Sequence, residues 1–190
     1  MISLSIGLVE LIYSGRPTVG FCHIDQCSIE NQKLTFRPNG DPIRMEVLGV
    51  AQNSSLFYDE FHVNYKEDWV SKRFRIYHDD QRIEVSWTVG PVPVENLVGK
   101  EVVTRMCDRS IISNGTFFTD SNGRQIMERK RDGRPSYEID PDTEAVSQDY
   151  YPVTAMISIR DNQEEMAVLT DRAQGGSSLE DGCIELMLHR

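Results

Sequence analysis

The sequence lacks a long apolar run and an excess of positive charge. The apolar segment at residues 1–9 is short, lacks a basic n-region and is interrupted by Glu10. A membrane-spanning helix needs about 20 apolar residues, so we expect a strand or short helix here and no membrane anchor. The segment is also a poor match to a secretory signal peptide. The net charge of −10 argues against nucleic acid as a partner, because such binding depends on basic side chains that neutralise phosphates.

The sequence also lacks a recognisable metal-binding motif. Its 4 histidines are far apart, and no two of them have the spacing of a zinc-binding pair. They are His23, His62, His78 and His189. His23 and Asp25 form a His-x-Asp pair, but each of the four histidines is more typical of a surface or strand-face residue than of a metal ligand. We therefore predict that this chain binds no metal ion.

Cysteine is scarce, with 4 in the chain. Cys22 and Cys27 are close enough to form a small disulfide loop in an oxidising compartment. No Cys-x-x-Cys pair occurs, which argues against a zinc tetrad. We predict that Cys107 and Cys183 are buried free thiols.

Helical periodicity is scarce too, whereas strand and turn signals recur along the chain. Residues 74–78 and 82–87 alternate in polarity on either side of a turn, which predicts a hairpin. Asn122-Gly123 is typical of a two-residue hairpin turn, and Pro91 ends the preceding strand because proline cannot donate to a ladder. Further strands are predicted at residues 45–50, 57–65, 102–106, 124–129, 155–159, 166–170 and 183–188. Many short strands joined by turns predict an all-β, antiparallel sandwich.

Two connecting segments stand out. Residues 133–148 are polar and contain Pro135 and Pro141, so we predict an exposed crossing loop. Near the end of the chain, a glycine- and serine-rich turn is predicted between two strands. Its residues are Gly175, Gly176, Ser177 and Ser178. In the strand that follows, Ile184, Leu186 and Leu188 alternate with other residues, which predicts one buried face.

Four strings of residues carry a resemblance to a known family. Residues 171–190 read Asp-Arg-x-Gln-Gly-Gly-Ser-Ser-Leu-x-Asp-Gly-x-x-Glu-Leu-Met-x-His-Arg, and the other strings cover residues 87–94, 99–105 and 118–124. In this order they resemble the C-terminal half of the glycoside hydrolase family 38 α-mannosidases, most closely the lysosomal type. The resemblance covers residues 34–190, a truncated β-sandwich domain, whereas residues 1–33 form a divergent N-terminal segment.

The resemblance implies a fold and a role. The C-terminal half of these enzymes has a mutarotase-like supersandwich, which this chain would contain incompletely at one or both ends. Family enzymes hydrolyse α-linked mannose with an aspartate nucleophile and a zinc ion, both in an N-terminal catalytic domain. We therefore expect a non-catalytic β domain, inactive alone, that supports a missing catalytic domain acting on mannose-containing oligosaccharides. Zinc belongs to the full-length enzyme and is not expected in this chain.

The resemblance also singles out individual residues. Arg190 closes the Leu-Met-x-His-Arg string, and the matching arginine of the family lies near the substrate pocket; the alternative is a terminal arginine without such a contact. The loop at residues 175–178 is expected to be structural and to pack against the catalytic domain. Sequons at Asn53, in the loop predicted between the strands at residues 45–50 and 57–65, and at Asn114 are candidate glycosylation sites. With the resemblance they favour a protein of the lysosome or the secretory pathway.

Two other functions remain open. The chain could be a stand-alone carbohydrate-binding or interaction module without hydrolase activity. It could also be an epimerase on the same general fold, but that reaction needs a His and a Glu in one groove, and the sequence offers no clear pair. We therefore rank the epimerase last.

Overall fold

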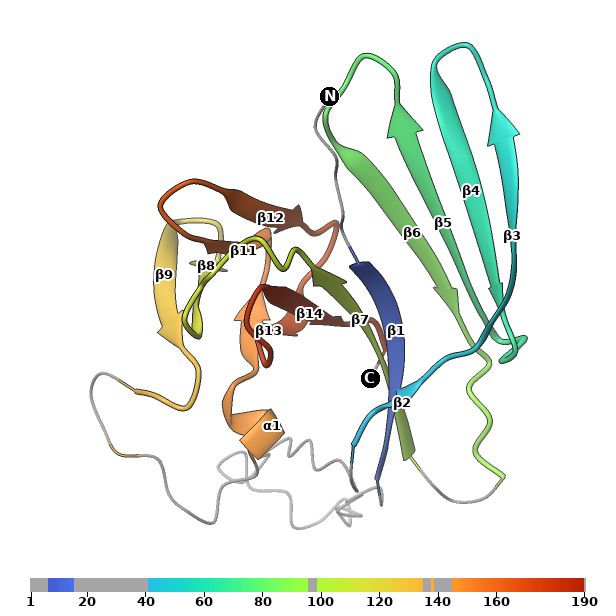
Figure 1. Cartoon of the computed structure of the whole chain (residues 1–190). Coiled ribbons are helices and arrows are strands. Elements are labelled where there is room, and N and C mark those ends of the chain that lie inside the picture. Colours follow the sequence, from blue (N-terminus) through green and yellow to red (C-terminus); the bar gives the residue numbers. More distant parts are fainter. Residues whose placement is uncertain (1–6, 16–40, 96–98, 135–137, 139–144, 190) are drawn as a thin grey trace.

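The structure, a computed structural model, describes residues 7–15, 41–95, 99–134, 138 and 145–189. In these ranges the chain forms strands β1–β14 and one short helix, α1. The paired strands run antiparallel throughout, in three sheets (Figure 1). The prediction of an all-β antiparallel sandwich is confirmed. No helix within these ranges is long and apolar enough to cross a membrane.

The central sheet has the order β10-β13-β14-β7-β1-β2. Its strands are β1 (Gly7–Gly15), β2 (Ile43–Arg44), β7 (Gly99–Cys107), β10 (Tyr151–Val153), β13 (Gln174–Ser177) and β14 (Cys183–Met187). Strand β1 pairs with β7 along its whole length, from Gly7 beside Cys107 to Gly15 beside Gly99. The N-terminal segment that lies outside the family resemblance thus supplies a strand to this sheet.

The other two sheets have four strands each. The outer sheet has the order β12-β11-β8-β9, formed by β8 (Thr116–Ser121), β9 (Gln125–Lys130), β11 (Met156–Arg160) and β12 (Glu165–Leu169). The lateral sheet has the order β3-β4-β5-β6, formed by β3 (Val47–Ser54), β4 (Tyr58–Tyr65), β5 (Val70–Tyr77) and β6 (Ile83–Val89). In Figure 1 the lateral sheet stands to one side of the other two.

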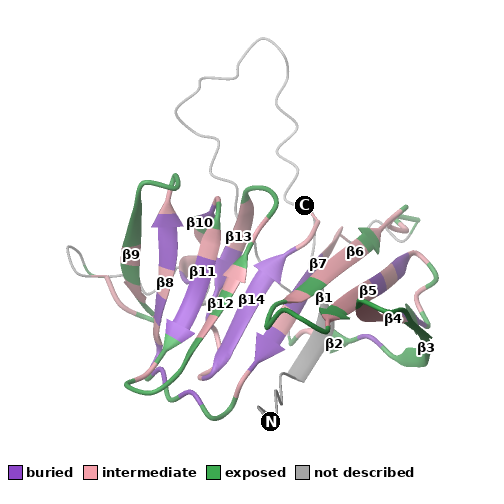
Figure 2. Cartoon of the chain, turned by 90° about the horizontal axis from the view of Figure 1, so that it is seen from above, coloured by how far each residue is buried: buried purple, intermediate pink, exposed green. Residues whose placement is uncertain are grey.

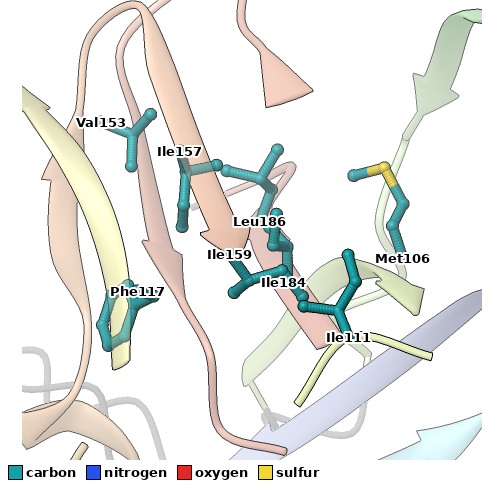
Figure 3. Close-up of a cluster of buried hydrophobic side chains, with 8 residues drawn as sticks. All are labelled: Met106, Ile111, Phe117, Val153, Ile157, Ile159, Ile184 and Leu186. Atoms are coloured by element: carbon teal, nitrogen blue, oxygen red, sulfur yellow. The ribbon is translucent and has the colours of Figure 1, made fainter. Parts of the chain in front are cut away.

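The main core lies between the central and the outer sheet (Figure 3). Most of its side chains are β-branched or aromatic and come from strands of the two sheets, as expected for strands with one buried face. The core residues are Met106, Ile111, Phe117, Val153, Ile157, Ile159, Ile184 and Leu186. The lateral sheet has a separate, smaller core around Met45, Val63, Tyr65 and Val70.

The hairpin turn predicted at Asn122-Gly123 is confirmed. Asn122 and Gly123 both have positive φ, 52° and 66°, and the N–H of Arg124 donates to the carbonyl of Ser121 at 3.0 Å. This is the backbone of a tight hairpin turn between β8 and β9. The hairpin of β5 and β6 is also present, and β6 ends directly before Gly90-Pro91.

Three local predictions were wrong. Helix α1 (Ala145–Gln148) lies inside the segment predicted to be only a crossing loop. Asn53 and Ser54 of the first sequon belong to strand β3 and not to a loop. The glycine- and serine-rich segment is a strand, because Gly175, Gly176 and Ser177 pair as part of β13 with β10 and β14.

Candidate functional site

Strand β14 is buried along its whole length (Figure 2). It lies between β13 and β7, and the N–H of Leu188 donates to the carbonyl of Val102 at 2.9 Å, which extends this pairing past the strand. Ile184 and Leu186 enter the main core. The opposite face is covered as well, so the prediction of a single buried face was wrong. The β14 site is defined here as β14, the residues that cover this second face and the turn before the strand.

Apolar and charged groups share the second face. Met187 packs with Val103, and Val146 of helix α1 and Tyr150 pack against this pair. Helix α1 therefore contributes to the cover that the alternating pattern of the sequence could not reveal.

A buried carboxylate lies at the centre of this face. Glu185 is 1% exposed, and the Nε and Nη2 atoms of Arg105 donate to its Oε2 at 3.0 and 2.7 Å. The hydroxyl of Tyr150 donates to the other oxygen, Oε1. A buried charge is destabilising unless it is paired and hydrogen-bonded, and these partners meet that need. The pair joins β14 to β7 across the sheet.

A second carboxylate extends the network toward solvent. Glu180 accepts from Nη1 of Arg105 at 3.3 Å and from Nη2 of Arg109 at 2.8 Å. It lies in the turn between β13 and β14, so the network fixes this turn as well as the strand.

The turn itself needs specific residues. Gly182 has φ of +72°, and a Cβ there would lie 2.7 Å from the carbonyl oxygen of Asp108. Asp181 accepts from the hydroxyl of Ser113 at 2.8 Å and from the N–H of Gly115 at 3.0 Å. Burial alone would raise the pKa of Asp181, but these hydrogen bonds lower it below the usual value. The Asp-Gly pair of the sequence string is therefore structural.

Another buried aspartate holds the segment before β10. The carboxylate of Asp149 accepts the N–H of Asp132 at 3.0 Å and lies 3.7 Å from Nη1 of Arg134. Its carbonyl accepts the hydroxyl of Ser177 at 2.8 Å. Burial raises the pKa of Asp149 to about 6, because the charged form loses its hydration.

The two cysteines predicted to be free thiols form a disulfide. Cys107 and Cys183 are opposite each other on β7 and β14, with a Cα–Cα distance of 4.1 Å. The prediction was wrong because 76 residues separate the two cysteines in the chain, and only strand pairing brings them together.

The structure locates only some of the predicted site residues. Arg190, Cys22, Cys27, His23 and Asp25 lie outside the described residues. Ser177 and Ser178 are fully buried inside this chain, so these two are not available to pack against another domain. Asn53 and Asn114 are both exposed.

The network at the β14 site could hardly be predicted from the sequence. Glu185 reads as one polar position in an alternating strand, and its partner Arg105 is 80 residues away in the chain. A lone acidic residue inside an apolar run was the only available signal.

The His, Cys, Asp and Glu side chains of the described residues do not form a metal-binding site. Among the described residues, no three His, Cys, Asp or Glu side chains are arranged to hold an ion. His62 contacts Glu60 at 2.8 Å, and His78 contacts Asp59 at 3.3 Å, both as pairs on the lateral sheet. These geometries satisfy hydrogen bonds rather than metal coordination.

Comparisons with a family profile and with individual proteins identify the same family. A profile of the glycosyl hydrolases family 38 C-terminal domain matches residues 35–190. The lysosomal alpha-mannosidase of Felis catus is 49% identical over 158 residues, and that of Mus musculus is 45% identical over 157 residues; each match covers 82% of this chain and 15% of the relative. An alpha-mannosidase of Canavalia ensiformis is 41% identical over 160 residues, covering 82% of this chain and 16% of the relative. The chain thus spans less than a fifth of the length of these relatives.

Proposed function

The chain belongs to glycosyl hydrolase family 38 as a C-terminal domain, and from this premise we propose that it supports the catalytic domain of an α-mannosidase. The whole enzyme would hydrolyse terminal α-linked mannose from glycoprotein oligosaccharides. The chain itself would be non-catalytic, and it would complete one wall of the substrate pocket through residues after β14.

The observation that carries this proposal is the burial of strand β14, which belongs to the sequence string shared with the family. Strand β14 is covered on both faces, and the Glu185 carboxylate is held by Arg105 and Tyr150. A retaining glycosidase needs two carboxyl groups that face the substrate about 5 Å apart. The buried carboxylates at the β14 site instead bind their own fold. This supports a structural role for β14, in which the buried strand holds in place the residues that follow it, including Arg190.

Zinc is proposed only for the rest of the enzyme. The described residues form pairs rather than a ligand set, so no chemical step is assigned to a metal in this chain. If the whole protein binds zinc, its ligands belong to the catalytic domain.

A lysosomal or secretory location is also proposed. Support comes from the relatives, which include lysosomal enzymes, and from the disulfide between Cys107 and Cys183. Structural disulfides persist in oxidising compartments and are rare in the cytosol.

A stand-alone interaction module is the second candidate. The lateral sheet favours it, because its edge strand β3 is exposed along its whole length and carries Leu48 and Val50, which are 67% and 56% exposed. Exposed apolar groups that gather in one place mark contact surfaces. The same surface would also suit contact with the rest of a larger enzyme.

One experiment separates the two candidates. The chain is assayed for hydrolysis of an aryl α-mannoside at acidic pH with added zinc, alone and co-expressed with a family 38 enzyme that lacks the matching C-terminal segment. We expect no turnover alone and restored turnover on co-expression. Arg105→Ala should reduce the restoration because it leaves Glu185 buried without its cation, whereas Arg82→Ala, on an exposed side chain of the lateral sheet, should not.

Two results would contradict the proposal. Turnover by the chain alone would place catalytic groups within it, and His23, Asp25 and His189 would be the first to substitute. A folded chain that restores no activity, yet binds immobilised mannose-containing oligosaccharides, would favour the interaction module.

A further inference from the structure

A tight turn precedes strand β8 and carries one of the two sequons. The N–H of Thr116 donates to the carbonyl of Ser113 at 2.9 Å, and the two residues between them, Asn114 and Gly115, have φ of 52° and 70°. Asparagine and glycine tolerate this left-handed backbone better than other residues. The turn is therefore well determined by its own sequence.

The backbone of this turn is fixed, whereas the Asn114 side chain is not. The N–H of Gly115 donates to Asp181 at 3.0 Å, and Nζ of Lys130 donates to the carbonyl of Asn114. Asn114 is exposed, and no described residue forms a hydrogen bond with its side-chain amide. The amide thus stands in solvent on a rigid support.

The rest of the sequon is compatible with modification. Thr116 is the first residue of β8, and its hydroxyl only accepts a 3.3 Å hydrogen bond from Lys130. Ile112 is 62% exposed two residues before Asn114. A glycan on Asn114 would therefore extend from the turn without displacing a buried group.

An independent observation points to the compartment. The disulfide between Cys107 and Cys183 closes across β7 and β14, and such bonds form in the oxidising lumen of the secretory pathway. N-linked glycans are added in that same lumen. The sequon and the disulfide are separate features of the chain, and both favour passage through the secretory pathway.

We propose that Asn114 carries an N-linked glycan. In the transfer, the bond between C1 of the sugar and the diphosphate of a lipid-linked oligosaccharide breaks, and a bond forms between C1 and Nδ2 of Asn114. The lipid diphosphate leaves with the electron pair of the broken bond, and the one proton lost from Nδ2 passes to a base of the transferring enzyme and then to water. This inference rests on the proposed secretory route and not on mannosidase activity.

The other sequon serves as a comparison within the same chain. Asn53 lies in strand β3, and the Ser55 hydroxyl that completes its sequon is used in the following turn. It donates to the carbonyl of Tyr58 at 3.0 Å and accepts the N–H of Phe57 and of Tyr58 at 3.2 and 3.1 Å. We expect Asn114 to be the more fully occupied site.

The test translates the full chain behind a cleavable signal peptide into microsomes and scores only protease-protected, lumenal chains. Deglycosylation with a peptide N-glycosidase in ¹⁸O water converts a modified asparagine to labelled aspartate, which peptide mass spectrometry locates. We expect label at Asn114 in the wild-type chain. Thr116→Val should abolish this label, Thr116→Ser should keep it because serine still completes the sequon, and Asn53→Gln should leave it unchanged.

Unlabelled Asn114 in lumenal wild-type chains would overturn the proposal, and so would label at Asn114 in the Thr116→Val variant. Because the signal peptide forces entry into the lumen, failure here concerns the site alone. The natural route is tested separately, by whether Cys107 and Cys183 are oxidised in the protein from its own cells.

Discussion

Single buried carboxylates fix several of the connections in this fold. Asp120 is the clearest case, because its carboxylate ties the turn after β8 to the start of β11. It accepts the N–H of Gly123 at 2.8 Å and those of Ala155 and Met156 at 2.9 and 3.1 Å. Burial alone would raise the pKa of Asp120, but these bonds and those from Thr154 hold it well below its usual range.

Substituting this carboxylate should be costly. Asp120→Asn keeps the shape of the side chain but replaces charge-assisted hydrogen bonds and leaves one backbone donor facing an amide nitrogen. We expect the free energy of unfolding to fall by about 2–4 kcal/mol at pH 7, measured by urea denaturation. Asp68→Asn, in the exposed β4–β5 turn, is the matched control and should change stability by less than about 0.5 kcal/mol.

The lowered pKa of Asp120 also predicts that the free energy of unfolding decreases at acidic pH. Since the pKa of Asp120 is lower in the folded than in the unfolded chain, its contribution is present above the unfolded pKa of about 3.9 and is lost as the pH falls through the folded value. The stability gap between Asp120→Asn and the wild type should therefore narrow below pH 4. A gap that stays constant to pH 2 would contradict this account.

Asp149 should act in the opposite direction. Its pKa is raised to about 6 by burial, and the charged groups that face it are Asp132 and Arg134. Between the unfolded value of about 3.9 and the folded value the native state holds the extra proton, so stability falls as the pH rises through this window.

Asp149→Asn removes this titration. The variant should lose less stability than the wild type between pH 4 and pH 7, by on the order of 1–3 kcal/mol, when urea denaturation is compared across that range. Equal slopes for the two proteins would show that the carboxyl has no raised pKa in the folded chain.

At the scale of elements, β13 shows why a glycine pair can belong to a strand. A Cβ on Gly176 would lie 2.7 Å from Cγ2 of Val153, 3.1 Å from Cδ1 of Ile157 and 3.2 Å from Cδ2 of Leu186. The absent side chain lets β13 approach the main core closely. Glycine weakens a strand in isolation, and here close packing outweighs that weakness.

Gly176→Ala tests this reading. The added methyl group overpacks the core, so we expect a loss of about 1–3 kcal/mol in the free energy of unfolding. Gly49→Ala in β3 is the control, because a Cβ there meets nothing within 4 Å and the change should be neutral or slightly stabilising. If both variants behaved alike, close packing at Gly176 would not be the reason for glycine.

At the scale of the whole molecule, the two larger hydrophobic cores of the described residues share no residue. One lies between the central and outer sheets, and the other belongs to the lateral sheet. Within the described ranges, the strands of the lateral sheet pack mainly on one another. Separate cores allow parts of a chain to open with different free energies.

Hydrogen exchange should detect this division. Val63→Ala, in the lateral core, should speed amide exchange in β3–β6 and leave β7 and β14 protected. Ile157→Ala, in the main core, should destabilise by about 2–5 kcal/mol and speed exchange in β7, β8, β11 and β14. Faster exchange of all strands in both variants would show one cooperative unit instead.

The sequence by itself determined most of the strands, the clearest turns and the family. Alternating polarity, the Asn122-Gly123 turn and Pro91 act over a few residues, so their consequences can be read locally. The family was predictable for the same reason, because each string that carries the resemblance is contiguous in the chain.

Only the tertiary structure decided which strands meet and what each buried group contacts. The Cys107–Cys183 disulfide, the pair of Arg105 with Glu185 and the close packing at Gly176 all join residues that are distant in the chain. The second covered face of β14 likewise depends on helix α1 and Tyr150. Such contacts depend on the register between strands, and periodicity within a single strand carries no information about its neighbours.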